Sequence, residues 1–382
     1  NPKKDNGYKE YDYLCATTLS YFFLDLLIKA IKSEFIIKDY LIYVLLATVC
    51  DVMPLRKLNR LIALNAIKNF DITKNLAFNI LFELNNKKNK ININDLGYLI
   101  GPILNAGGRL GKSQYATELL SSNNIMVVND RSNILVKLNN KRKEIETLIL
   151  NEIDFQQIEK ENKDVIIYYN PNINEGLIGI IAARLKDYFN KPSIVITASK
   201  ELLKGSARSV YDYNIGHLIK KSLDQGLILN GGGHNMAAGF MLNKVNLEVF
   251  EDYILKDFSK SNIVNNNIYT YESEISSLAF KQDFYDNINK LEPFGTGNPV
   301  PAFMIKDLKI IKPTILNNKH ISAILKSQTG FSIKSISFNS INTKVGEYLM
   351  NYKDNINVIG QINENLWNNK KTLQLTIIDI IM

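Results

Sequence analysis

The hydrophobic pattern of this 382-residue chain changes twice along its length, and these changes limit the folds that it can adopt. Residues 12–70 and 73–88 carry apolar residues at helical spacing. Residues 164–223 alternate short apolar runs with helical segments, which is the rhythm of a small α/β domain. From residue 269 the runs are short, and residues 372–378 alternate with a period of two. The last part therefore predicts a small β-barrel, for which an oligonucleotide-binding (OB) barrel is the natural candidate.

A long charged helical pattern covers residues 128–161, between the helical part and the α/β part. It contains no glycine and no proline, and its apolar residues recur at helical spacing. We expect a connector helix between domains here, rather than a core helix.

Composition narrows the class of protein. The chain is 46% hydrophobic and 22% charged, as in an ordinary globular protein, and its length suggests two or three domains. Apolar runs are too short to span a membrane, and the polar start does not resemble a signal peptide. Cys15 and Cys50 lie in apolar helical patterns, which indicates buried thiols of a cytoplasmic protein. The net charge of +8 favours a polyanionic partner.

Arginine is scarce against a background of lysine. A retained arginine in such a chain hints at a need for the planar guanidinium, which binds phosphate through two parallel hydrogen bonds. The seven arginines are Arg56, Arg60, Arg109, Arg131, Arg142, Arg184 and Arg208.

A glycine-rich segment with one of the three histidines is the most informative short motif. Gly231, Gly232 and Gly233 precede His234, and three glycines predict an exposed loop whose backbone N–H groups can approach an anion. His234 could donate a hydrogen bond or a proton near neutral pH. The run 236–239 predicts the first turn of a helix. By itself the motif fits a simple turn with a surface histidine equally well.

Three further segments combine a charged residue with small or helix-ending neighbours. Asp51 ends an apolar helix before Pro54. Its carboxylate could bind Mg²⁺ or Mn²⁺, or the residue could simply cap the helix. Arg109 is the cation of a glycine-rich loop expected over residues 101–111. Ser206 and Arg208 lie among small residues at a strand end, as in an anion site or an ordinary turn.

Six motifs in this order resemble one family, the RecJ family of bacterial single-strand-specific DNA exonucleases, in the DHH phosphoesterase superfamily. The resemblance covers essentially the whole chain. The motifs are Thr48–Leu55, Asn105–Arg109, Glu175–Leu185, Gly205–Ser209, Gly231–His234 and Leu291–Pro301. We interpret the last, a rigid aromatic segment, as an elbow that joins domains, rather than as a platform for base stacking.

The resemblance implies an α/β fold class in four parts. These are the C-terminal part of a DHH phosphoesterase domain (1–127), a long connector helix (128–161), a DHH-associated α/β domain (162–265) and an OB-type β-barrel (266–382). It implies a 5′→3′ exonuclease that hydrolyses single-stranded DNA by two-metal catalysis with Mn²⁺ or Mg²⁺, in DNA repair and recombination. Implied partners are single-stranded DNA, a single-strand-binding protein and a helicase. It also implies a cytoplasmic monomer without a membrane segment.

The same resemblance assigns roles to particular residues. Asp51 matches a metal-binding aspartate of the two-metal site, and His234 matches a histidine that faces the scissile phosphate, which makes both catalytic candidates. Residues that match the substrate-binding set, of which the arginines and the serine hold the 5′-phosphate, are Asn105, Arg109, Ser206, Arg208, Gly231, Gly232 and Gly233.

The chain departs from the family pattern at its start. The family's aspartate pair, a further aspartate and the Asp-His-His element belong upstream of its Asn-Pro-Lys, here residues 1–3, so we expect most metal ligands upstream of this sequence. Asn174 stands where the family often has histidine. Two alternatives remain open: a DHH-type phosphodiesterase for short RNA or cyclic dinucleotides, and a non-catalytic nucleic-acid-binding relative. The barrel argues against the first, and Asp51 with His234 against the second.

Overall fold

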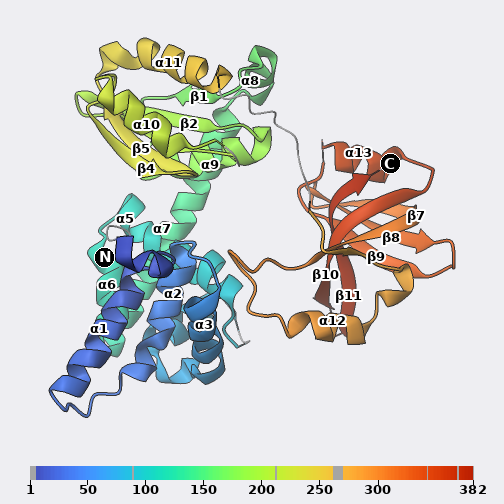
Figure 1. The fold of residues 1–382 in the computed structure, drawn as a ribbon, viewed down its shortest axis with the longest axis horizontal. Helices are drawn as coiled ribbons and strands as arrows, with labels where there is room; N and C mark the ends of the chain where they lie inside the picture. Colours follow the sequence, from blue (N-terminus) through green and yellow to red (C-terminus); the bar gives the residue numbers. More distant parts are fainter. Residues whose placement is uncertain are drawn as a thin grey trace. The chain divides into compact units, whose positions relative to one another are not determined.

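The computed structural model describes residues 6–87, 90–210, 213–260, 270–341, 343–367 and 370–381, so the motif residues 1–3 lie outside it. The chain divides into two compact units, which Figure 1 shows as ribbons. The first combines Asn1–Phe70 with Asn267–Met382, and the second is Asp71–Asn266. Among the described residues, no helix is both long and apolar enough to cross a bilayer.

Three helices open the first unit, as the apolar spacing predicted. They and two short 3₁₀ turns are η1 (Asn6–Tyr11), α1 (Ala16–Ala30), η2 (Ile37–Tyr40), α2 (Leu41–Cys50) and α3 (Lys57–Asn69). Helix α2 ends because Val52 adopts a φ of 56° and Pro54 lacks a backbone N–H. The Asn59 side chain donates to the carbonyls of Tyr13 (2.9 Å) and Pro54 (3.1 Å), and thereby fixes α3 against the segments before α1 and after α2.

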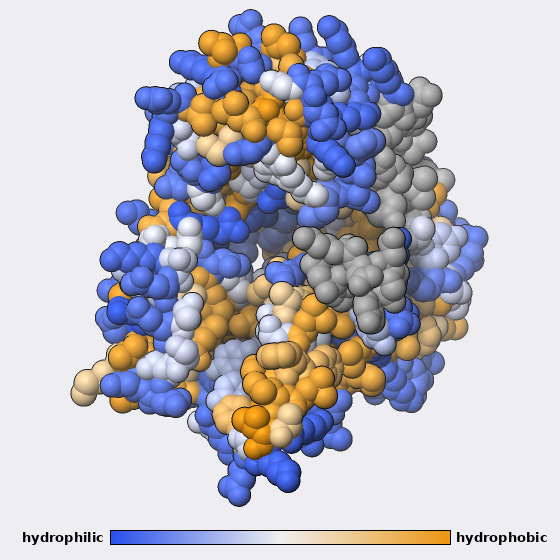
Figure 2. All heavy atoms as spheres, turned by 60° about the vertical axis from the view of Figure 1, so that its left-hand side comes forward, coloured by the Kyte–Doolittle hydropathy of each residue, from blue (hydrophilic) through white to orange (hydrophobic). Residues whose placement is uncertain are grey.

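Helix α1 leaves much of its apolar surface open. Phe23 is 65% exposed, Leu26 66% and Ile31 65%, within the described residues. Figure 2 shows a patch of apolar side chains in the lower centre of the view, with hydrophilic side chains below and beside it. By contrast α2 buries Leu45 fully, so α2 rather than α1 is the core helix of this group.

A β-barrel forms the remainder of the first unit. Its elements are β6 (Ser273–Glu274), η6 (Ser277–Ala279), α12 (Gln282–Asn289), β7 (Ala302–Leu316), β8 (His320–Ser327), β9 (Ser332–Ser337), α13 (Lys344–Asn351), β10 (Ile356–Trp367) and β11 (Lys370–Ile381). The sheet runs β10-β11-β9-β8-β7-β6, and an additional β10–β7 pairing closes five strands into a barrel. Leu308, Leu325, Ile333, Val358 and Leu375 are fully buried inside it. The OB-type barrel expected from the sequence is therefore confirmed.

The segment expected to be an elbow, 291–301, contacts the loop between α2 and α3 within the first unit. The Leu55 N–H donates to the Thr296 carbonyl (2.6 Å), and the Arg60 guanidinium donates to the Glu292 carbonyl (2.7 Å). Gly297 has a φ of 74°, and a Cβ there would lie 2.8 Å from the Pro54 side chain. A glycine is thus required both by conformation and by space. These contacts tie the segment to α3 and to the loop before it, and the domain-joining elbow stays a prediction.

The second unit starts with helices packed around one long helix. They are η3 (Ile72–Lys74), α4 (Leu76–Leu84), a short π-helix η4 (Asp95–Ile100), α5 (Gly101–Leu110), α6 (Gln114–Ser121), α7 (Ile125–Glu152) and α8 (Phe155–Glu161). The single helix expected over 128–161 is therefore two helices, because Asp154 caps a new helix at the Gln157 N–H. Nor is α7 a mere connector, since it packs against α4, α5 and α6 and buries Leu135 completely.

A mixed five-stranded sheet completes the second unit. Its elements are β1 (Ile166–Tyr169), α9 (Ile178–Phe189), β2 (Ser193–Ser199), β3 (Leu202–Arg208), α10 (Ile215–Asp224), β4 (Asn230–His234), β5 (Ala237–Leu242), η5 (Lys244–Asn246) and α11 (Leu247–Ser259). The order is β1-β2-β3-β5-β4, with β1 parallel to β2 and the other pairs antiparallel. The helical turn expected at 236–239 is wrong, because these residues enter strand β5.

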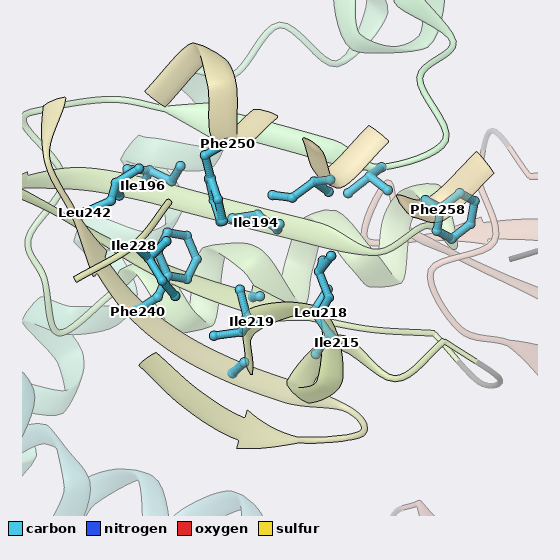
Figure 3. Close-up of a cluster of buried hydrophobic side chains, with 14 of the residues drawn as sticks. Ile194, Ile196, Ile215, Leu218, Ile219, Ile228, Phe240, Leu242, Phe250 and Phe258 are labelled. Carbon is cyan, nitrogen blue, oxygen red and sulfur yellow. The ribbon is translucent and has the colours of Figure 1, made fainter. Parts of the chain in front are cut away.

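Apolar side chains cover the two faces of this sheet differently. On one face α10 and α11, the latter through Phe250, pack over Ile194 and Phe240 of the sheet, as Figure 3 shows. On the other face α9 covers β1, β2 and β3, with Leu177 and Leu185 fully buried. Alternation along β3 therefore sends Leu203 and Ala207 into the first core, while Ser206 and Arg208 lie on the α9 face.

Candidate functional site

Ser206 and Arg208 meet the first turn of α9. The Arg208 guanidinium donates to the Ser206 hydroxyl (3.1 Å) and to the Ala207 carbonyl (2.8 Å). A Cβ at Gly179 would lie 2.9 Å from Arg208 Nη2 and 3.1 Å from Ser206 Oγ. Real Cβ contacts are essentially never as short as 2.9 Å, so a Cβ at this position would displace the guanidinium end of the Arg208 side chain.

Arg109 joins these residues from the last turn of α5. The glycine-rich loop expected over 101–111 is wrong, because α5 runs through Gly107 and Gly108. Arg109 Nη1 donates to the Gly176 carbonyl (2.9 Å), and a Cβ at Gly176 would lie 2.5 Å from the Arg109 carbonyl oxygen. Asn105 is exposed four residues earlier, on the same side of α5 as Arg109. We call Arg109, Ser206, Arg208 and Gly179 the arginine site.

Burial and a neighbouring arginine act on the pKa of each guanidinium group. Burial lowers the pKa of Arg208 below its ordinary value, and the neighbouring Arg109 lowers it further. Burial likewise lowers the pKa of Arg109, with a smaller contribution in the same direction from Arg142 and an opposing one from the Glu146 carboxylate. Arginine nevertheless stays charged at neutral pH, because its ordinary pKa lies above about 12. Two half-buried cations are thus held close together.

One buried carboxylate serves this cluster, but it is engaged by other arginines. Glu146 on α7, with a side chain 9% exposed, accepts from Arg142 Nη1 (2.7 Å) and from Arg184 Nε (2.7 Å). Within the described residues Arg109 and Arg208 have no carboxylate partner, and their hydrogen bonds go to neutral oxygens. The remaining N–H groups of the two guanidinium groups can therefore donate hydrogen bonds to an anion.

An open surface of small residues on the sheet adjoins the arginine site. We call this surface, formed by Ala237, Gly239 and Gly232, the floor. Across β5, Arg208 pairs with Ala237 and Ala237 pairs with His234, so Arg208 and His234 share one row and one face, with Cα atoms about 10 Å apart. In the next row Gly239 and Gly232 stand beside Ser206, and Cβ atoms at these glycines would meet no atom closer than 3.8 Å. A phosphate backbone can approach this part of the sheet closely.

The three glycines before His234 form an edge strand, not the expected loop, and none has a left-handed φ. A Cβ at Gly231 would lie 2.8 Å from Ile219, whereas one at Gly233 would lie 2.3 Å from the Ala237 carbonyl oxygen. Gly231 and Gly233 are thus required by packing, while Gly232 faces open space.

His234 is exposed at the end of β4, and its backbone is fixed from α10. A Cβ at Gly216 would lie 2.9 Å from the His234 carbonyl oxygen, and the Ile215 N–H donates to the Asn235 carbonyl (3.1 Å). The Met236 N–H approaches His234 Nδ1 (3.4 Å), which leaves the proton of the neutral ring on Nε2. His234 can therefore donate from Nε2 to an anion above the floor.

Asp51 belongs to the first compact unit and is an exposed carboxylate at the C-terminus of α2. Within the described residues no three histidine, cysteine, aspartate or glutamate side chains gather as a metal site would require. The carboxylate suits Mg²⁺ or Mn²⁺, but by itself it does not make a two-metal site.

Sequence reasoning found the charged residues of the site but missed those that position them. Gly179, Gly216 and Glu146 were not predicted as site residues. The spacing of Arg142 and Glu146, one helical turn apart, was the available signal for the buried ion pair. Gly179 indicated close packing of its helix but not what packs there, and Gly216 gave no signal, because the atoms that they accommodate are distant in sequence.

Comparisons with known proteins identify the class of protein first. The family model described as the DHHA1 domain matches residues 162–260, and the model described as the RecJ OB domain matches residues 271–379. The arginine site and its floor lie mainly in the first of these, with Arg109 supplied by α5. The chain thus contains a DHHA1 domain followed by a RecJ-type OB domain.

Named relatives identify the protein more narrowly than the domain models do. The chain is 31% identical over 323 residues to the single-stranded-DNA-specific exonuclease RecJ of Haemophilus influenzae, covering 80% of this chain and 56% of that protein. It is 26% identical over 350 residues to the RecJ of Bacillus subtilis, covering 87% and 43%. The chain is a RecJ homologue, which confirms the resemblance of its motifs, and it spans about half the length of these relatives.

A solved structure shows the same fold. The crystal structure of RecJ from Thermus thermophilus in complex with Mn²⁺ matches with a TM-score of 0.76 at 21% identity, covering 90% of this chain and 50% of that one.

Proposed function

We propose that this chain acts in a single-stranded-DNA-specific exonuclease, which degrades strands from the 5′ end. The observation that carries the proposal is the arginine site, in which Arg109 and Arg208 have no carboxylate partner among the described residues and adjoin an open floor. The names of the relatives support the same activity.

In this proposal the arginine site binds the terminal 5′-phosphate. Arg109 and Arg208 donate charge-assisted hydrogen bonds, and the Ser206 hydroxyl adds a neutral donor. A terminal phosphate carries close to two negative charges at neutral pH, whereas an internal phosphodiester carries one, so two cations without a carboxylate ion pair among the described residues favour the end of the strand. The strand then crosses Gly239 and Gly232, and His234 donates from Nε2 to a phosphate oxygen farther along. Degradation proceeds from the 5′ end because the arginine site holds the 5′-phosphate.

We further propose Mn²⁺ or Mg²⁺ as cofactors, with Asp51 as one carboxylate ligand. Two such ions would lower the pKa of a water molecule and stabilise the leaving oxygen when bound. The remaining ligands are not supplied by a cluster among the described residues, so no step is assigned to the metal ions from this structure. The RecJ structure that shares the fold is in complex with Mn²⁺.

The wider setting is proposed on the same basis. Single-stranded DNA is the partner of the barrel, and the enzyme acts as a cytoplasmic monomer in DNA repair and recombination, alongside a single-strand-binding protein and a helicase. We also propose the domain limits 1–127, 128–161, 162–265 and 266–382, with the helical segment divided as described above.

Binding of end-labelled oligonucleotides tests the proposal on residues 1–382 without catalysis. We expect a 5′-phosphorylated dT strand to bind about 10-fold or more tightly than its 5′-hydroxyl counterpart, because charge-assisted hydrogen bonds are worth about 1.5–3 kcal/mol. A 3′-phosphorylated strand has the same charge and is the control. Equal affinity for the 5′- and 3′-phosphorylated strands would refute the terminal-phosphate site.

A second candidate function is non-catalytic binding of nucleic acid. It is favoured by the lack of a metal-binding cluster among the described residues. If it is correct, neither residues 1–382 nor any longer natural chain hydrolyses single-stranded DNA with Mn²⁺ added. Hydrolysis by a longer chain that is lost in Asp51→Asn would exclude it.

A further inference from the structure

The floor ends at a row of larger side chains that has no role in the proposed function. Lys204 on β3 pairs with Met241 on β5, and Met241 pairs with Asn230 on β4. These residues lie two positions along their strands from the row that contains the glycines of the floor, so the two rows share one face of the sheet. The glycines are thus bounded by the row that contains His234 on one side and by this row, which we call the amide row, on the other.

Asn230 and Met241 present an amide and a thioether on this open face. Asn230 Nδ2 lies 3.8 Å from Met241 Sδ, and Asn230 is exposed. Within the described residues the Asn230 Oδ1 accepts no hydrogen bond, and Nδ2 keeps a second hydrogen to donate. A thioether packs favourably against an aromatic ring, and an amide offers a donor and an acceptor side by side. A planar ring with hydrogen-bonding groups on its edge, as in a nucleobase, matches this pair.

Charge distinguishes the amide row from the arginine site. The cation of the row, Lys204, donates to Glu175 Oε2 (2.9 Å) and is thereby paired. Arg109 and Arg208, by contrast, have no carboxylate partner among the described residues. A second phosphate would gain little at the amide row, because a carboxylate already balances the charge of the lysine there. The row therefore suits an uncharged part of a nucleotide.

We propose that Asn230 and Met241 bind the base of the 5′-terminal nucleotide, whose sugar and base lie over Gly232 and Gly239. The row of Arg208 and the amide row are four residues apart on β3, about 13 Å, which leaves room for one nucleoside beyond a phosphate held by the arginines. A Cβ at Gly232 would meet nothing within 4 Å, so the sheet itself does not fill this space. Because the amide both donates and accepts, the site holds any of the bases. This inference rests on the proposed function, since it adds a base site to the nucleotide whose phosphate the arginine site binds.

An abasic 5′ terminus tests the base site, with residues 1–382 as the protein and no added divalent metal. The probe is a 5′-phosphorylated dT strand of about 12 nucleotides, either intact or with its first nucleotide replaced by an abasic residue. We expect the intact strand to bind about 5-fold or more tightly, because a hydrogen bond and a contact between sulfur and a ring are lost with the base. An abasic residue at the 3′ terminus is the control and should change the affinity by less than about 2-fold.

Two variants connect this loss to the amide row. In Asn230→Ala/Met241→Ala we expect the ratio of affinities for the intact and the abasic strand to fall to about 1. Gly232→Val should give the same result with both side chains in place, because a Cβ there meets no atom within 4 Å while the valine occupies the space of the base. Asn133→Ala, which removes an exposed amide from α7, is the matched control and should keep the wild-type ratio.

The preference for a 5′-phosphorylated over a 5′-hydroxyl strand, measured in parallel, reports the arginine site separately. Equal affinity of the wild type for the intact and the 5′-abasic strand would overturn the base site, even if the 5′-phosphate preference persists. A ratio that both variants leave unchanged would also overturn it, as would an equal loss for an abasic residue at either terminus. If the 5′-phosphate preference is absent while the base effect is lost in both variants, the base site stands and the terminal-phosphate site is refuted.

Discussion

At the scale of single residues, the site is set by glycines that admit larger groups. Gly179 accommodates Arg208 and Ser206, Gly176 accommodates the Arg109 backbone, and Gly216 accommodates the His234 backbone. From sequence, Arg109, Ser206, Arg208 and His234 could be selected, because phosphate binding needs such side chains among small residues. Their glycine supports could not, because each contact is made across the fold.

Gly179→Ala tests this positioning directly. The added Cβ would meet Arg208 Nη2 at 2.9 Å, so we expect the guanidinium to shift and the preference for a 5′-phosphate to fall about 5-fold or more. Gly108→Ala, next to Arg109, is the matched control because its Cβ would meet nothing within 4 Å. Both variants replace a helical glycine, so Gly108→Ala should raise the free energy of unfolding by up to about 1 kcal/mol without changing the preference. An unaltered preference in Gly179→Ala would contradict the steric account.

At the scale of elements, some segments adopt a structure that their local sequence does not favour. In these segments long-range packing determines the secondary structure. The run 236–239 favours a helix by propensity, yet β5 is inserted between β3 and β4 and is fixed by pairing on both sides. Helix α5 contains Gly101, Gly107 and Gly108, which predicted a loop. It persists because a close approach to α7 is possible at Gly107, where a Cβ would lie 3.0 Å from Leu135. The helices between residues 12 and 70 and the strands at 166–169 and 193–199 were predicted from their periodicity, whereas the equally periodic pattern over 128–161 was predicted as one helix and is two.

The buried ion pair between Arg142 and Glu146 within α7, which Arg184 of α9 joins, leads to a prediction at the same scale. Glu146→Gln removes the charge that offsets Arg142, whose side chain is 11% exposed. Since breaking a buried pair leaves an uncompensated charge, we expect the free energy of unfolding to fall by about 3 kcal/mol. Glu144→Gln is exposed on the same helix and should change it by less than about 0.5 kcal/mol. Chemical denaturation measures both, and equal effects would show that the pair is not coupled to stability.

At the scale of the whole molecule, the α/β part depends on residues outside the region matched by its domain model. Ile149 on α7 and Ile153 after it join the core that α9 covers, together with Leu177 and Val195. The DHHA1 match begins at residue 162 and therefore omits both isoleucines. The order of helical, α/β and barrel parts could be predicted from periodicity, but not this dependence, because the isoleucines contact strands that follow them in sequence.

Truncation tests this dependence. We expect the segment 143–260 to unfold cooperatively, and the segment 162–260 to be less stable by at least about 3 kcal/mol, because burial of an isoleucine contributes about 1.5–3 kcal/mol. Urea denaturation followed by circular dichroism compares the two. Equal stabilities would show that Ile149 and Ile153 are dispensable and that the α/β part ends at the matched boundary.

The central claim is that Arg109 and Arg208 together hold the 5′-phosphate of a single strand. The most direct measurement is the ratio of affinities for 5′-phosphorylated and 5′-hydroxyl oligonucleotides in Arg109→Gln/Arg208→Gln and in the wild type. We predict that the ratio falls from about 10 or more to about 1, while affinity for the 5′-hydroxyl strand changes less than about 3-fold and so reports an intact fold. A ratio that stays at its wild-type value in the double variant would contradict the account.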